Sequence, residues 1–135
     1  MKKIFLATVL FILINASNIE WIKDIDKAIN LAKNENKNLL LIVSSKHCPY
    51  CKKMEKDIFN DKDSQKYLLK RYILVKLDIK EAKKISLDTK VTPTTYIFTP
   101  NKELLASQVG YQNEEFFYYT LTNADNKLKE LKKDN

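Results

Sequence analysis

Hydrophobic and polar positions divide the chain into alternating helix-like and strand-like segments. Over residues 19–36, apolar residues recur every three or four positions, which predicts an amphipathic helix. Residues 38–45 contain an uninterrupted apolar run, Leu39-Leu40-Leu41-Ile42-Val43, typical of a strand buried on both faces. Three further strands are predicted over 72–78, 94–99 and 103–109, and helices over 48–58, 61–71, 81–86 and 114–133. The pattern therefore predicts a single α/β domain.

The first seventeen residues differ from this pattern and resemble a secretory signal peptide. A basic start precedes an apolar run over residues 4–14, and small and polar residues follow. This run is too short for a membrane span, which needs about 20 residues. We therefore predict a signal peptide over residues 1–17, cleaved near Ala16 or Ser17, and a domain over 18–135 in the periplasm. An uncleaved apolar segment is the alternative.

Composition narrows the chemistry that the domain can perform. The chain of 135 residues has one glycine, which excludes glycine-rich phosphate loops and dinucleotide fingerprints. Its two cysteines are too few for a multi-disulfide scaffold or a four-thiolate zinc site. The net charge is +7, but Arg71 is the single arginine and the lysines are interleaved with acids. This distribution indicates a solvated basic surface, and we expect no nucleic-acid partner.

The cysteines lie three residues apart, where the first strand meets the following helix. Free N–H groups and the helix dipole at that junction stabilise a thiolate on Cys48, which makes it the expected nucleophile. Cys51 lies one turn inward, where its thiol can attack a mixed disulfide formed by Cys48. Pro49 suits the first helical turn, where a missing N–H costs least. We expect a redox-active dithiol that needs no cofactor.

Two other interpretations of the cysteine pair are a structural disulfide and a metal site. A structural disulfide would close a very short loop and so remove little entropy from the unfolded chain. Zinc would need two more ligands, and the single histidine, His47, is adjacent to Cys48 and poorly placed to complete a tetrahedron. We therefore predict no metal, although a Cys-X-X-Cys metal carrier stays an alternative. His47 is expected either to tune Cys48 or to be solvated.

Two segments give the chain its resemblance to the thioredoxin superfamily. They are His47-Cys48-Pro49-Tyr50-Cys51 after the first long strand and Val91-Thr92-Pro93-Thr94 before the third. The resemblance implies the thioredoxin fold, an α/β single domain with a central mixed four-stranded sheet flanked by helices. It also implies that Pro93 is cis and that Thr92 and Pro93 bind the substrate chain beside Cys48. The helix over residues 51–59 is similar to that of periplasmic thiol-disulfide interchange (Dsb-like) proteins.

Several positions depart from the thioredoxin pattern. Pro49-Tyr50 is the pair typical of glutaredoxins, whose glutathione site nevertheless requires glycines that this chain lacks. Ile42 stands where thioredoxins carry a buried acid, six residues before the first cysteine. The group that deprotonates Cys51 is therefore open, with water, Lys52 and Glu55 as the alternatives.

These observations predict an exported thiol-disulfide oxidoreductase. It would be a monomer that exchanges disulfides with the thiols and disulfides of exported proteins, more often as a reductant. The resemblance implies a membrane electron-donor or electron-acceptor protein as its redox partner. The alternative is a non-catalytic binding module or chaperone with the same fold.

Overall fold

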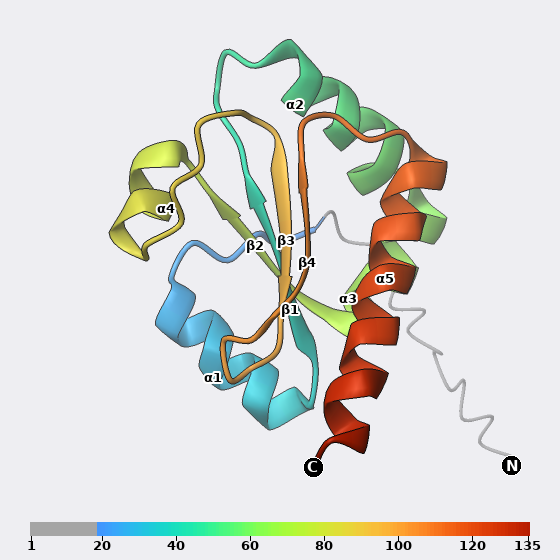
Figure 1. Ribbon diagram of the computed structural model, residues 1–135. Helices are drawn as coiled ribbons and strands as arrows, with labels where there is room; N and C mark the ends of the chain where they lie inside the picture. The colour runs from blue at the N-terminus through green and yellow to red at the C-terminus, as the bar shows by residue number, and fades with distance from the viewer. Residues whose placement is uncertain (1–18) are drawn as a thin grey trace, which may run out of the picture.

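The computed structural model describes residues 19–135 and contains one mixed sheet between two layers of helices (Figure 1). The signal peptide predicted over residues 1–17 lies outside the described residues. The strand order is β2-β1-β3-β4, with β2 parallel to β1, and β3 antiparallel to both β1 and β4. In chain order the elements are α1 (Ile25–Glu35), β1 (Asn38–Val43), α2 (Pro49–Met54), the π-helical turn η1 (Glu55–Phe59), α3 (Lys62–Arg71), β2 (Tyr72–Leu77), α4 (Ile79–Lys84), β3 (Thr94–Phe98), β4 (Leu104–Val109) and α5 (Glu114–Lys133). The predicted thioredoxin fold is confirmed.

Strand β1 is the central element, as its continuous apolar sequence predicts. Alternate side chains of a strand point to opposite faces, so Leu40 and Ile42 belong to one core while Leu39, Leu41 and Val43 belong to the other. Every residue from Leu39 to Val43 is buried. A strand with no solvated face has to be covered by helices on both sides.

The helices provide that cover in two groups (Figure 1). Helices α1 and α4 pack on the face that carries Leu39 and Leu41. Helices α2, α3 and α5 pack on the opposite face, where Phe59 contacts Trp21 and Phe117 edge-to-face, with ring centroids 5.0 and 5.5 Å apart. Such aromatic pairs add to the stabilisation that comes from burying their area. The helix bearing the cysteines is therefore fixed to the sheet through the core.

The helix predicted to begin at residue 19 begins only at Ile25. The Asp24 side chain accepts hydrogen bonds from the N–H groups of Asp26 and Lys27, which places the N-cap there. Before it the chain is extended, and Ile22 forms a parallel bridge with Val75 of β2. The prediction was wrong at this end because the spacing of neighbouring apolar residues does not show that a segment pairs with a strand elsewhere in the chain.

Helix α2 passes directly into a π-helical turn. The predicted helix over 48–58 is present, with Cys51, Met54 and Ile58 on its buried side. In η1 the N–H of Asn60 donates to the carbonyl of Glu55 at 2.7 Å, a spacing of five residues rather than four. Such wide turns are often found at functional sites.

Adjacent phenylalanines at the start of α5 give a direct test of core packing. Phe117 is fully buried, whereas Phe116 is 62% exposed. We predict that Phe117→Ala lowers the free energy of unfolding by about 3–5 kcal/mol, because it leaves a cavity against Phe59. Phe116→Ala should lower it by less than about 0.5 kcal/mol. Urea unfolding measures both losses of free energy, provided that the dependence of the free energy on urea concentration is the same in the variants. Equal losses would contradict the packing described here.

Candidate functional site

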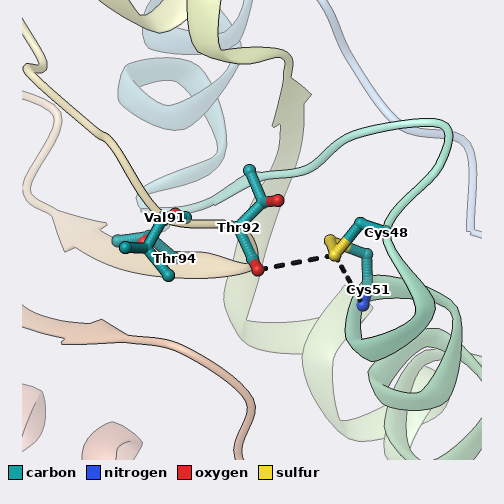
Figure 2. Close-up of a disulfide and its surroundings, with 5 residues drawn as sticks. All are labelled: Cys48, Cys51, Val91, Thr92 and Thr94. Atoms are coloured by element: carbon teal, nitrogen blue, oxygen red, sulfur yellow. Dashed lines mark hydrogen bonds between the residues drawn. A yellow bond between two sulfur atoms is a disulfide. The ribbon is translucent and has the colours of Figure 1, made fainter.

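Cys48 and Cys51 form a disulfide at the end of β1, where the chain enters α2 (Figure 2). Cys48 is the N-cap residue of α2 in extended conformation, and Pro49 occupies the first helical turn. The two Cα atoms are 5.2 Å apart, which is within the usual range for a disulfide. The structure thus brings the two predicted redox residues together.

The two sulfur atoms have different surroundings. Cys48 is half-buried and Cys51 is buried, with 6% of its surface exposed. The backbone N–H of Cys51 points at Sγ of Cys48 across 3.1 Å. A thiolate on Cys48 would keep this hydrogen bond, which favours the charged form of a nucleophile. Cys48 can therefore meet a partner from solution, while Cys51 can reach only Cys48.

The loop before β3 forms the second wall of the site. The Thr92–Pro93 peptide bond is cis, as the resemblance implied. The carbonyl oxygen of Thr92 lies 3.4 Å from Sγ of Cys48, within reach of a thiol S–H in the reduced protein (Figure 2). Thr94 Oγ1 donates to the carbonyl of Val91 at 2.7 Å, and the Pro93 carbonyl accepts from Gly110 N–H at 2.8 Å. The loop is held on both sides beside the cysteines.

The predicted neighbours of the cysteines are exposed. His47 and Pro49 face solvent, and Tyr50 is 62% exposed. Within residues 19–135 the His47 side chain has no hydrogen-bond partner. Any effect of His47 on Cys48 would therefore act through charge, and this role stays a prediction.

Tyr111 joins the active-site helix to the loop between β4 and α5. Its hydroxyl donates to Asp57 Oδ2 at 2.9 Å, and Lys53 Nζ donates to the same oxygen at 2.6 Å. The hydrogen bond from Lys53, and then the one from Tyr111, hold the pKa of the Asp57 carboxyl below its usual value. The hydrogen bond to Asp57 in turn raises the pKa of Lys53. The Tyr111 ring also lies 6.0 Å from that of Tyr50. Sequence spacing indicates the Lys53–Asp57 pair, but it does not indicate Tyr111 as their partner.

A second ion pair lies behind the cysteines. Lys76 Nζ of β2 is 3.3 Å from Glu55 Oε1 and 4.4 Å from the centroid of the Trp21 ring. Lys76 and Glu55 line a small cavity that also touches Cys51 and Ile42. Its volume of about 10 Å³ is about what one water molecule needs. Of the groups considered for deprotonating Cys51, Glu55 and water thus have a place beside it. Lys76 was not predicted, because a lysine in a strand has no local signal of its partner.

Ligands for a metal are not gathered around the cysteines. Across residues 19–135 no three histidine, cysteine, aspartate or glutamate side chains form a cluster able to hold an ion. A tetrahedral zinc site needs four ligands, usually from these residue types. The described residues therefore offer a zinc ion no more than the two thiolates that the disulfide already uses.

The comparisons with known proteins agree with this geometry. The family model described as a thioredoxin-like domain matches residues 25–124. Anterior gradient protein 2 of Xenopus tropicalis is 27% identical over 103 residues, which are 75% of this chain and 62% of that protein. The chain thus spans less than two thirds of the length of this relative.

Solved structures show the same fold. A thioredoxin from Thermus thermophilus superposes with a TM-score of 0.66 at 20% identity, covering 78% of this chain and 86% of that one. The DsbH oxidoreductase gives a TM-score of 0.65 at 15% identity, covering 81% and 86%. At these identities the likeness shows the fold alone. The family model extends over both the cysteines and the cis-proline loop, and the chain therefore belongs to the thioredoxin-like domain family.

Proposed function

We propose that the protein is an exported thiol-disulfide oxidoreductase that exchanges disulfides with protein substrates through Cys48 and Cys51. The observation that carries this proposal is the position of Cys48, half-buried, facing the Cys51 N–H and lying 3.4 Å from the Thr92 carbonyl. The thioredoxin-like domain and its Cys-X-X-Cys pair support this class of enzyme. No cofactor is required, because the dithiol itself carries two electrons.

In the reductive direction, the Cys48 thiolate attacks one sulfur of a substrate disulfide. A mixed disulfide forms, and the other substrate sulfur leaves as a thiolate that takes up a proton. The deprotonated Cys51 then attacks Cys48 Sγ, which releases the second substrate thiolate and closes the Cys48–Cys51 disulfide. The substrate gains two electrons and the protein loses two. A dithiol protein at the membrane would return them.

Thr92 and Pro93 would align the substrate chain in this reaction. Thr92 is half-buried and Pro93 is buried, so the loop offers a substrate mainly its backbone. An extended segment lying along this loop would have its sulfur beside Cys48. His47, Pro49 and Tyr50 would form the exposed rim that such a segment crosses.

The direction of electron flow is proposed from the sequence of the active-site helix, which resembles that of Dsb-like proteins. Reduction potentials of related dithiols extend from about −270 to about −120 mV. We place this protein on the reducing side of that range. The pair Pro49-Tyr50 helps to set the value, because the two residues between the cysteines influence it.

Export and the periplasm are proposed from residues 1–17, which have the order of a signal peptide. Among residues 19–135 no helix combines the length and the apolar character needed to cross a membrane. We propose that the protein acts as a monomer on the thiols of other exported proteins.

Substitution of the cysteines tests the proposed order of attack. Cys51→Ser should accumulate mixed disulfides between Cys48 and substrate proteins, because the resolving thiol is gone. Cys48→Ser should accumulate few, since Cys51 is buried. Acid quenching, alkylation and mass spectrometry of purified complexes measure both variants. Adducts that form equally through Cys51 would refute the order, and unchanged partner binding without either cysteine would favour the non-catalytic binding module or chaperone.

Glu55 is proposed to take the proton of Cys51 through a water in the cavity that both residues line. Glu55→Gln should then lengthen the lifetime of the mixed disulfide by about tenfold near pH 6.5. The difference should shrink as rising pH ionises Cys51 without help. Glu130→Gln, a change of the same chemistry on the surface of α5, is the control.

Stopped-flow measurement of substrate release gives this pH profile. A lifetime that Glu55→Gln leaves unchanged at every pH would exclude Glu55 as the proton acceptor. An equal increase at every pH would indicate a packing defect instead.

A further inference from the structure

The segment that carries the cysteines has more basic groups than it neutralises. Residues 44–59 include four lysines and two acids. Asp57 pairs with Lys53 at 2.6 Å, and Glu55 pairs with Lys76 of β2 at 3.3 Å. Both acids are thus engaged. Within residues 19–135, three lysines of the segment form no salt bridge: Lys46, Lys52 and Lys56.

These three lysines are all exposed, and they lie within eight residues of Cys48 in the chain. Lys52 follows Cys48 by four residues, and its N–H bonds to the Cys48 carbonyl at 3.2 Å. Lys56 follows Lys52 by four more. Residues at this spacing share a helix face, and Lys46 lies in the turn just before Cys48. Together Lys46, Lys52 and Lys56 form what we call the lysine ridge.

Apart from the lysine ridge, the side chains around Cys48 contribute little net charge to the site. On the cis-proline loop, Lys90 and Asp88 pair at 3.8 Å, so they cancel each other. Elsewhere around the site, Val91 is 48% exposed and Tyr50 is 62% exposed, and the exposed His47 precedes Cys48. The acids Glu114 and Glu115 begin α5, beyond Tyr111, and Tyr111 contacts Lys53 on another face of the helix.

We propose that the lysine ridge docks an acidic segment of the substrate protein next to the disulfide that Cys48 attacks. This proposal rests on the proposed function and adds a substrate class to it. Clustered charges of one sign raise the rate at which an oppositely charged partner meets a site, by 10-fold or more at low salt. Their effect is screened within about 10 Å at 0.1 M salt. The ridge would therefore act on association rather than on bond exchange.

The test compares disulfide-bonded peptides of one length that differ only in the residues flanking the cysteines, either glutamate or lysine. The pre-reduced protein reacts with each in a single turnover, which needs no other reductant. At low salt the acidic peptide should react about tenfold faster than the basic one. The ratio should approach one near 1 M salt, where the screening length is about 3 Å.

Two triple variants of equal net charge separate the ridge from the overall charge of the protein. Lys46→Glu, Lys52→Glu and Lys56→Glu together should abolish or invert the preference. Lys23→Glu, Lys27→Glu and Lys129→Glu, at exposed positions on other elements, should retain it. The neutral compound bis(2-hydroxyethyl) disulfide corrects each variant for changes in the reactivity of Cys48.

The outcomes distinguish the two proposals. If the protein reduces all the disulfides but prefers neither peptide, or if both triple variants lose the preference equally, the lysine ridge is not a docking surface. If it reduces neither the peptides nor the neutral disulfide, the proposed oxidoreductase function fails instead.

Discussion

The burial of β1 on both faces is the constraint on which the site depends. A strand without a solvated face requires a layer of helices on each side. The chain can reach the surface only beyond the carboxyl end of the strand, where the cysteine segment follows. Val43 ends the strand and pairs with Thr94 of β3. This single register places the segment after Val43, with Cys48, opposite the segment before Thr94, with Thr92 and Pro93. The sulfur and the carbonyl 3.4 Å away follow from that pairing.

Two ion pairs engage both acids of the active-site helix and leave its exposed face basic. Lys53 and Asp57, with Tyr111, join it to the loop before α5. Glu55 and Lys76 join it to β2. Exposed ion pairs contribute little to stability, and their larger consequence here is electrostatic. Both acids of the segment are occupied, so the remaining lysines determine which partner the surface attracts.

Much of this arrangement could be predicted from the sequence because it has local causes. The apolar run of β1 and the apolar periodicity of α3 and α5 arise within a few residues, and the structure has these elements close to where the pattern placed them. The cysteine pair and the cis-proline loop followed from motifs. The extended segment at Ile22 and the partners of Lys76 and Tyr111 could not be predicted in this way. Each depends on a contact between residues more than 20 positions apart, which no local pattern records.

The equilibrium between Cys48–Cys51 and a glutathione buffer tests the central claim most directly, because a redox catalyst must open and close its disulfide under conditions that proteins meet. Alkylation and mass spectrometry across a series of buffers give the fraction reduced. The account predicts a reversible two-electron transition between about −270 and −120 mV, towards the reducing end. A disulfide that stays closed to below about −300 mV, as structural disulfides typically do, would contradict it.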